Sequence, residues 1–379
     1  MKILIAGLAT FEQMTGGSAR YLSGVASALE ARGNEVAVVT AASRIHTRGF
    51  SQVGFRGQLS RSLQRLFVVM PTMAFEVLRR RPDVVYSHFA LDGAAAVLAA
   101  RVMRTPVVVM FQGPWASEAR ATGLRGRWPL SNQLRRAIER FVYRRASTCI
   151  TLSRAFASLL EREYGISPSR ITVIPGGIDS AHFAPAGDRA AVRRSLGWPD
   201  VFTIVTVRRL VPRMGLDIAI RAIPLVTAEM AVELVIAGSG PEESRLRELA
   251  DEYGVASQVH FLGRVPENAL PSVYAAADLC VVPSRELEGF GYVALEALAA
   301  GTPVIAAETG GLSEIIGPLE PRWLVPAEPQ PLADAIKGWA VHATEFPSRA
   351  QCIAYASKFD WEIIGAEVEK ILASATTRR

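Results

Sequence analysis

Short apolar runs that alternate with helical segments are the feature that most constrains this fold. Each run is rich in Val and Ile, and the segment after it shows the apolar spacing of a helix. In the first half the runs are KILIAG, EVAVVT, DVVYSH, TPVVVMF, STCITLS and RITVIPGG. Continuous apolar strands separated by helices are typical of a parallel sheet covered on both faces. The first half therefore predicts a doubly wound α/β domain.

A second series of the same kind follows a polar connection at 185–199. Its apolar runs are FTIVTV, VELVIAG, VHFLG, LCVVPS and PVIAAE. A chain of 379 residues is long enough for two domains, each with its own core. We therefore predict two Rossmann-like domains.

The most informative stretch runs from Cys280 to Ile316. It reads as strand, glycine-containing loop, short helix, strand and a Gly-Gly pair, with the helix beginning at about Gly291 or Tyr292. Eight positions separate Glu288 from Glu296, which corresponds to roughly 12 Å along a helix. That length suits two carboxylates that hold the two ends of a nucleotide sugar. The alternative is two glutamates on a solvated helix face.

The run PSRELEGFGYVALEALAAGTPVIAAETGGLSEII resembles the donor-site signature of the family 4 retaining glycosyltransferases, which have the GT-B fold. The resemblance implies two Rossmann-like domains that face each other across a cleft. Residues 1–178 would bind the acceptor, and residues 179–357 would bind the nucleotide-diphospho-sugar donor. VIPGGID at 173–179 resembles the hinge of the family. The amphipathic tail, 358–379, is expected to cross back onto the first domain.

The resemblance also assigns donor-binding roles in the second domain. Glu288 would orient the donor sugar and Glu296 would hold the ribose. Phe290 and Gly291 would offer backbone N–H groups to the diphosphate. Arg264, in LGRV, would contribute backbone contacts near the base.

The segment VTVRRLVPRMGLD follows the first strand of the second domain, where ligands bind in doubly wound sheets. Arg209 matches the arginine of the family's G-R-L pattern and is predicted to meet the phosphates. Met214 stands where the family has lysine, so Arg208 or Arg213 would have to supply the second cation. The alternative is an arginine cluster at the surface.

The first loop, 9–17, lacks the G-x-G-x-x-G pattern of dinucleotide-binding domains. Gly16 and Gly17 open the first helix. Their role is either helix packing or, as the resemblance implies, donation of backbone N–H groups to the donor diphosphate.

Three further residues are candidates in the first domain. Gln112 follows PVVVMF where the family often has histidine; an amide can position a sugar but cannot act as a general base. His88, after DVVYS, and Trp115 are candidates on the acceptor side. The alternative for His88 is a structural role.

Charge is unevenly divided along the chain. Residues 1–170 contain 24 Lys+Arg against 10 Asp+Glu, a net charge of +14, whereas 171–379 contain 18 against 26, a net charge of −8. The basic half suits an anionic membrane or acceptor, unless nucleotide-composition bias produced it. Segments 44–81 and 113–145 mix Arg with large apolar residues. We interpret them as ordinary amphipathic helices in preference to membrane-surface helices.

The remaining composition predicts a cytoplasmic protein. No apolar run reaches the roughly 18 residues of a membrane span, and MKILIAG reads as a first strand. Cys149, Cys280 and Cys352 are predicted to be buried thiols in a reducing compartment. The histidines lack metal-site spacing and no Asp-x-Asp pair is present, so we expect neither a metal nor a cofactor. Nucleic acid is not an expected partner, and peripheral contact with the inner membrane face is an alternative.

Together these patterns predict a metal-independent retaining glycosyltransferase of glycan or glycoconjugate biosynthesis. It would move a sugar from a nucleotide-diphospho-sugar to a hydroxyl of a lipid-linked, polysaccharide or small-molecule acceptor. The resemblance implies front-face attack, in which the leaving diphosphate takes the proton of the acceptor. One alternative is a weakly active or inactive partner-binding subunit, which Met214 and Gln112 favour and the glutamate pair opposes. Another is a sugar-nucleotide epimerase.

Overall fold

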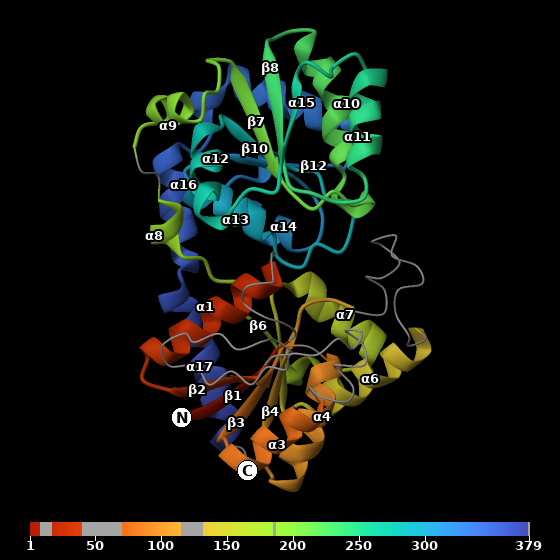
Figure 1. Cartoon of the computed structure of the whole chain (residues 1–379), viewed down its shortest axis with the longest axis vertical. Helices are drawn as coiled ribbons and strands as arrows, with labels where there is room; N and C mark the ends of the chain where they lie inside the picture. Colours follow the sequence, from red (N-terminus) through yellow and green to blue (C-terminus); the bar gives the residue numbers. More distant parts are fainter. Residues whose placement is uncertain (8–16, 40–69, 89, 115–131, 185–186, 378–379) are drawn as a thin grey trace. The chain divides into compact units, whose positions relative to one another are not determined.

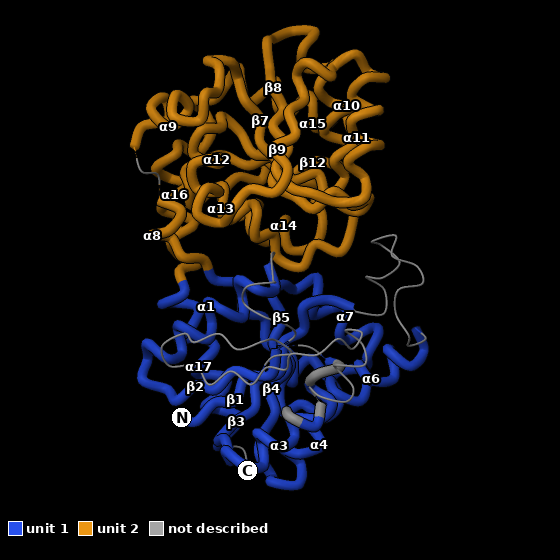
Figure 2. Tube along the Cα trace, in the orientation of Figure 1, with its two compact units in different colours: residues 1–120, 124–177, 361–379 blue, residues 121–123, 178–360 orange. Residues whose placement is uncertain are grey.

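The computed structural model describes residues 1–7, 17–39, 70–88, 90–114, 132–184 and 187–377. The chain forms two compact units (Figure 2). Unit 1 contains residues 1–120, 124–177 and 361–379, and unit 2 contains residues 121–123 and 178–360. Each unit is a parallel six-stranded sheet with helices on both faces, as the apolar runs predict (Figure 1).

The sheet of unit 1 has the order β2-β1-β3-β4-β5-β6. Five of its strands are almost wholly buried, because helices cover both sides of a parallel sheet, whereas the edge strand β6 is partly exposed. Their bounds are β1 Lys2–Ala6, β2 Glu35–Val39, β3 Val84–Ser87, β4 Val107–Phe111, β5 Thr148–Thr151 and β6 Ile171–Val173.

Two groups of helices cover the sheet of unit 1. Right-handed crossovers place α1 on one face and α3, α4, α6 and α7 on the other. The last helix, α17, packs against α1 (Figure 1). Their bounds are α1 Gly17–Ala31, α3 Met70–Arg80, α4 Ala90–Val102, α6 Asn132–Arg145, α7 Arg154–Tyr164 and α17 Trp361–Thr377.

The amphipathic segments expected at 44–81 and 113–145 are described in part. Residues 44–69 and 115–131 lie outside the described residues. The rest forms α3 and α6, and each helix buries one face, with Met73 and Val77 in α3 and Val142 and Tyr143 in α6.

The sheet of unit 2 has the order β12-β11-β10-β7-β8-β9. Five of its strands coincide with the predicted apolar runs, and the two-residue β12 has no such run to reveal it. The bounds are β7 Phe202–Val207, β8 Val232–Ala237, β9 Val259–Gly263, β10 Leu279–Val282, β11 Val304–Ala307 and β12 Leu324–Val325.

The helices of unit 2 also form two groups. α10, α11 and α15 pack together, as do α9, α12, α13, α14 and α16, and the short α8 contacts α12 and α13. Their bounds are α8 Ser180–Phe183, α9 Arg189–Ser195, α10 Leu216–Thr227, α11 Glu243–Glu252, α12 Leu270–Ala276, α13 Tyr292–Ala299, α14 Gly311–Ile316, α15 Pro329–Val341 and α16 Arg349–Ala356.

Among the described residues, the chain passes from one unit to the other after Gly177 and after Asp360. In unit 2 the two passages adjoin, since the Ile178 N–H donates to the Phe359 carbonyl at 2.8 Å. In unit 1, a side chain at Gly177 or at Gly24 of α1 would overlap the Trp361 ring. The C-terminal helix therefore returns to the first domain, as predicted.

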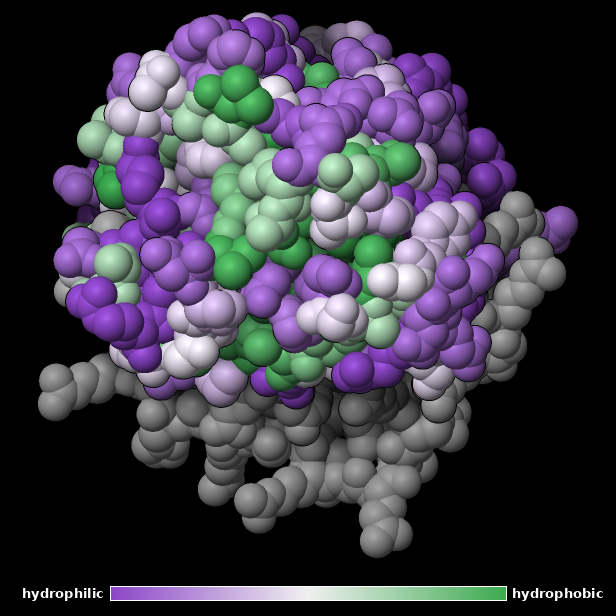
Figure 3. All heavy atoms as spheres, turned by 90° about the horizontal axis from the view of Figure 1, so that it is seen from above, coloured by the Kyte–Doolittle hydropathy of each residue, from purple (hydrophilic) through white to green (hydrophobic). Residues whose placement is uncertain are grey.

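The cysteines, the surface and the helices agree with the composition of the sequence. Cys149, Cys280 and Cys352 are buried free thiols, as predicted. On the face of the molecule seen in Figure 3, hydrophobic patches lie between more numerous hydrophilic residues. Within the described ranges, no helix has both the length and the hydrophobicity to cross a membrane.

Candidate functional site

The strand order of unit 2 reverses between β7 and β10, which are neighbours in the sheet. From β7 the chain proceeds to β8 and β9 on one side, and from β10 it proceeds to β11 and β12 on the other. Loops that follow two such strands diverge and leave room for a ligand at their carboxyl ends. The loop after β7 begins with Arg208, and the loop after β10 contains Ser284 and Glu288. The residues at this switch point are therefore the first to consider as a binding site.

Arg208, Ser284 and Glu288 form a buried polar cluster at the switch point. Arg208 Nη2 donates to Glu288 Oε2 at 2.5 Å and also contacts Ser284 Oγ. Ser284 Oγ donates to the same carboxylate oxygen at 3.1 Å. The side chains of Arg208 and Glu288 are only 5% and 13% exposed. Both donors use Oε2, and no hydrogen bond from a described residue reaches Oε1.

The cluster keeps Glu288 ionised. Burial raises the pKa of Glu288, but the charge and hydrogen bond of Arg208, the charge of Arg213 and the Ser284 hydroxyl outweigh it. The net effect lowers the pKa below its ordinary value of 4.5. Glu288 is therefore a hydrogen-bond acceptor at neutral pH.

The backbone around Glu288 is fixed by the Gly-Gly pair after β11. The Gly311 N–H donates to the Glu288 carbonyl at 2.8 Å. A Cβ on Gly310 would overlap that carbonyl, and one on Gly311 would lie 2.6 Å from the Gly289 oxygen. Gly291 caps the N-terminus of α13 with a φ of 99°, in the region that glycine adopts freely. The glycines of this stretch thus serve close backbone packing as well as any approach of a ligand.

A second ion pair braces the loop after β10. The Arg285 guanidinium donates two hydrogen bonds of 2.6 Å to the Asp217 carboxylate on α10. Burial raises the pKa of Asp217, but Arg285 outweighs it and the pKa is lowered. The Arg285 N–H also donates to the Arg213 carbonyl at 3.0 Å, and Arg213 Nη1 donates to the Leu287 carbonyl at 3.2 Å. The loops after β7 and β10 are therefore tied together.

The arginine that reaches Glu288 is Arg208, the residue before the one that matches the family pattern. Arg209 is exposed. Successive residues at a strand end point to opposite sides, so two adjacent arginines cannot share one environment. Met214, at the position of the family lysine, is only 7% exposed and faces the interior of unit 2. Arg213 lies beside the Glu288 loop, and the phosphate contacts of Arg209 and Arg213 stay predictions.

Glu296 lies in a different environment from Glu288. It is only 1% exposed, and its Oε2 accepts a hydrogen bond of 2.8 Å from the Tyr274 hydroxyl on α12. The two carboxylates therefore have separate protein partners. Contact of Glu296 with a ribose stays a prediction.

Three other predicted donor-site residues are placed by the structure. Phe290 is buried with its ring centroid 4.9 Å from that of Tyr292, so its side chain is a core element. Gly291 is buried at the start of α13, and Arg264 is exposed after β9. Their backbone contacts with a donor stay predictions.

In unit 1, His88 directly follows β3 and is buried. Its ring lies 4.4 Å from that of Tyr86 and 5.5 Å from that of Tyr21, and no described residue makes a hydrogen bond to either ring nitrogen. Burial lowers the pKa of His88 to about 3, so the ring is neutral at physiological pH. This position fits the structural alternative, and the acceptor role stays a prediction.

The other candidates in unit 1 lie at the carboxyl ends of strands or outside the described residues. Gln112 follows β4 and is half-buried, and Gly17 is the first residue of α1. Gly16 and Trp115 lie outside the described residues.

Sequence reasoning did not single out Ser284, Arg285, Asp217 or Tyr274. Ser284 and Arg285 stand within the PSRELEG run, and their place in that run was the one feature of the sequence that could have identified them as site residues. Asp217 and Tyr274 belong to helices far away in sequence, and contact alone reveals them. In the part of the chain that the structure describes, no three His, Cys, Asp or Glu side chains are grouped as metal ligands.

Comparisons with known proteins agree with this architecture. Residues 188–359 match the family described as Glycosyl transferases group 1, and residues 15–182 match Glycosyltransferase Family 4. D-inositol 3-phosphate glycosyltransferase of Acidothermus cellulolyticus is 34% identical over 377 residues, covering 92% of this chain and 83% of that protein. A GDP-mannose-dependent monoacylated alpha-(1-6)-phosphatidylinositol monomannoside mannosyltransferase of Corynebacterium glutamicum is 34% identical over 217 residues, 53% of this chain and 55% of that protein.

Solved structures share the fold over the whole chain. Sucrose-phosphate synthase from Thermosynechococcus elongatus superposes with a TM-score of 0.83 at 21% identity and covers 100% of both chains. Anabaena HepE in complex with UDP and glucose has a TM-score of 0.80 at 22% identity, covering 99% of this chain and 100% of that one. The chain is a glycosyltransferase with the GT-B fold, and it belongs to family 4.

Proposed function

We propose that this glycosyltransferase moves a sugar from a nucleotide-diphospho-sugar to a hydroxyl acceptor with retention of the anomeric configuration. The observation that carries the proposal is the buried Arg208–Ser284–Glu288 cluster at the switch point of unit 2. A buried, ionised carboxylate with one committed oxygen and one oxygen available to a ligand suits a sugar hydroxyl.

In this proposal, the residues of unit 2 bind the donor. Glu288 Oε1 accepts a hydrogen bond from a hydroxyl of the donor sugar, while Arg208 holds the carboxylate in place. Arg209 and Arg213 oppose the charge of the diphosphate, which grows as the bond to the sugar breaks. Glu296 and the N-terminus of α13 provide the ribose and phosphate contacts that the family resemblance implies.

The proposed reaction is an exchange of two bonds at the anomeric carbon. The acceptor oxygen forms a bond to that carbon on the face from which the diphosphate departs, and the bond between carbon and diphosphate oxygen breaks. The hydroxyl proton passes to the departing diphosphate. Arginine side chains supply the positive charge, so the proposal includes no metal and no cofactor.

Relatives support the class of substrate. The relative from Corynebacterium glutamicum is named for its dependence on GDP-mannose, and structures of Anabaena HepE hold UDP or UDP-glucose. The relative from Acidothermus cellulolyticus is named for D-inositol 3-phosphate. A phosphorylated polyol or a lipid-linked polyol is therefore the first acceptor class to test. The net charge of +14 on residues 1–170 suits such an anion.

Calorimetric titration of the purified chain with UDP, GDP, ADP, dTDP and their hexose conjugates tests the proposal. We expect wild type to bind the nucleotides of one base selectively. The sugar conjugate of that nucleotide should bind Glu288→Gln more weakly than wild type, whereas the free nucleotide should bind the two proteins equally well. If none of these nucleotides bound, the donor assignment would be refuted.

Product analysis tests the reaction itself. Anomeric proton couplings in the transferred sugar distinguish retention from inversion, and activity after EDTA treatment reports on metal dependence. An inverted product would refute the retaining mechanism without affecting the donor assignment.

A further inference from the structure

Unit 1 has a pocket of about 460 Å³ at the edge of its sheet where β4 begins. We call it the amino-edge pocket and define it by Arg101, Arg104, Val107, Arg145 and Ser147, which are among its lining residues. His88 and Gln112 follow the carboxyl ends of β3 and β4, at the other edge of the same sheet. The pocket is therefore separate from the candidate acceptor residues.

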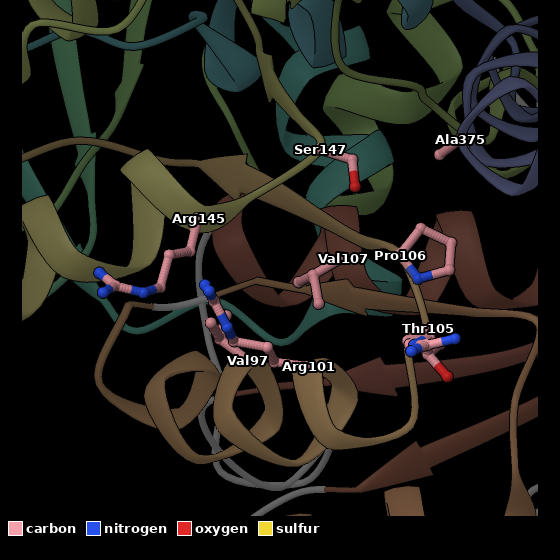
Figure 4. Close-up of a pocket in the computed structure, with 9 residues that line it drawn as sticks. Val97, Arg101, Thr105, Pro106, Val107, Arg145, Ser147 and Ala375 are labelled. Atoms are coloured by element: carbon pink, nitrogen blue, oxygen red, sulfur yellow. The ribbon is translucent and has the colours of Figure 1, made fainter. Parts of the chain in front are cut away.

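Topology brings the arginines of this pocket together. Helices of a doubly wound sheet run antiparallel to the strands, so each helix ends at the edge where the next strand begins. Arg101 lies in the last turn of α4 and Arg145 is the last residue of α6. Figure 4 shows Arg101 rising from α4 and Arg145 descending from the end of α6, on the same side of Val107. Two helix ends thus contribute positive charge to one concavity.

Arg104 occupies a backbone position that glycine would fill with less strain. Its φ is 55°, in the left-handed region that L-residues rarely adopt. Arg81 has the same setting after α3, with a φ of 48°, but does not line the pocket.

The three arginines of the pocket are not neutralised by described residues. The lining contains no Asp or Glu, and none of the three forms an ion pair with a described carboxylate. Other arginines of unit 1 have protein partners: Arg79 and Arg80 on α3 pair with Glu76, and Arg144 on α6 donates to the Tyr164 carbonyl. Arg145 stacks over the Phe141 ring at 4.2 Å, which restrains its guanidinium and leaves its charge unpaired by acids.

We propose that the amino-edge pocket binds a phosphate group. Guanidinium groups match phosphate oxygens with pairs of parallel hydrogen bonds, and three positive charges attract an anion. The Ser147 hydroxyl adds a neutral donor. The site consists of residues of unit 1, so the inference is independent of the proposed donor chemistry.

The surface beside the pocket favours a lipid headgroup as the source of the phosphate. Leu98 and Val102 are one turn apart on α4 and are 54% and 78% exposed. Phe75 and Leu78 are exposed on α3, which packs beside α4. Exposed apolar side chains next to arginines suit the interface of an anionic bilayer, where headgroup phosphate and acyl chain lie close together.

The test compares Arg104→Gly and the double variant Arg101→Gln/Arg104→Gly with wild type in the full chain. Arg81→Gly is the matched control, because it removes the same charge from the same backbone conformation outside the pocket. One arm titrates inorganic phosphate and glycerol 1-phosphate by calorimetry. The other measures cosedimentation with vesicles of phosphatidylglycerol and phosphatidylcholine, and with vesicles of phosphatidylcholine alone. Glycine tolerates positive φ, so both single variants should fold.

We expect Arg104→Gly to bind about fivefold more weakly and the double variant roughly 25-fold more weakly, with Arg81→Gly near wild type. This pattern in the vesicle arm alone identifies a lipid headgroup, and in the calorimetric arm it identifies a soluble phosphate. Absence of binding in both arms, or equal losses in Arg104→Gly and Arg81→Gly, would overturn the proposal.

Discussion

The Arg208 guanidinium donates a 2.5 Å hydrogen bond to the Glu288 carboxylate, and both side chains are nearly excluded from water. In the G-R-L pattern that this segment resembles, glycine stands at the position of Arg208, and glycine has no side chain to form this ion pair. A buried charge that loses its partner is costly, whereas removal of both charges costs much less. The pair therefore links the stability of unit 2 to the state of its candidate catalytic carboxylate.

Arg208→Ala should destabilise the protein by about 3 kcal/mol at pH 7, because it leaves the Glu288 carboxylate buried without its main counter-charge. Chemical denaturation measures this change. Arg208→Ala/Glu288→Gln should recover more than half of the loss. Additive effects of the two single substitutions would contradict the coupling.

The pH dependence of the same variant has a definite sign. In wild type the depressed pKa of Glu288 gives stability that is present above the ordinary value of 4.5 and is lost as pH falls through the folded-state value. In Arg208→Ala, burial should raise the pKa of Glu288, so the carboxyl protonates at a higher pH. The stability deficit should therefore shrink between pH 7 and pH 4, and a deficit that grows with acidity would contradict this account.

Gly310→Ala should destabilise unit 2 by about 2–3 kcal/mol, because φ is 55° and the new Cβ would overlap the Glu288 carbonyl. Donor affinity should fall with it, since the loop that holds Glu288 must move. Gly338→Ala in α15 is the control: nothing lies within 4 Å of its Cβ, and helix propensity predicts a gain of about 0.5–1 kcal/mol. Thermal unfolding of both variants makes the comparison, and similar melting temperatures would contradict it.

Glu296→Gln should weaken binding of the nucleotide sugar by about 1–3 kcal/mol if the carboxylate holds the ribose. Tyr274→Phe separates this role from a structural one, because it removes the 2.8 Å hydrogen bond to Glu296 and retains the ring. We expect Tyr274→Phe to lower stability by about 1 kcal/mol with a smaller effect on donor affinity. Equal donor affinity of wild type and Glu296→Gln would exclude the ribose contact.

Met214→Lys should not restore the cation of the family pattern. The side chain at this position is only 7% exposed and faces the interior, so an ammonium group would be buried without a partner. We expect a lower melting temperature and no gain in nucleoside diphosphate affinity. Tighter binding with unchanged stability would show that the side chain can turn toward the ligand.

The cysteines should be unreactive in the native protein. Burial raises the pKa of Cys149 and of Cys352 to about 12 and raises that of Cys280 further. Titration with Ellman's reagent should therefore be slow for the folded chain and should release three equivalents in guanidinium chloride. A rapidly reacting thiol in the native state would contradict their burial.

The sequence predicted the elements of the fold because their apolar runs are long and regular. Each of the eleven apolar runs that we named contains a strand. In ten of them the strand begins and ends within two residues of the ends of the run, whereas in RITVIPGG only the three residues of β6 are a strand. β12 escaped prediction because two residues provide no periodicity. Family membership was also predictable, since the loop after β10 has a specific order of glycines and glutamates.

The contacts of the site could not be predicted in the same way. Sequence spacing placed Glu288 and Glu296 as a pair, yet Glu288 contacts Arg208 and Glu296 contacts Tyr274. Which of two adjacent arginines turns inward depends on the pleat at the end of β7, and no pattern in the sequence specifies it. Roles for Arg209, Arg213 and Arg264 depend on a ligand and stay predictions.

The position of α17 has a consequence for biosynthesis. The described part of unit 2 lies between residues 178 and 360, whereas unit 1 also needs residues 361–377, whose Trp361 fills the space beside Gly24 and Gly177. A ribosome must therefore synthesise all of unit 2 before the last helix of unit 1 exists. Until α17 is synthesised, the surface of α1 around Gly24 lacks the Trp361 side chain that covers it in the folded chain. A chaperone that shields apolar surface could bind nascent unit 1 there during this interval.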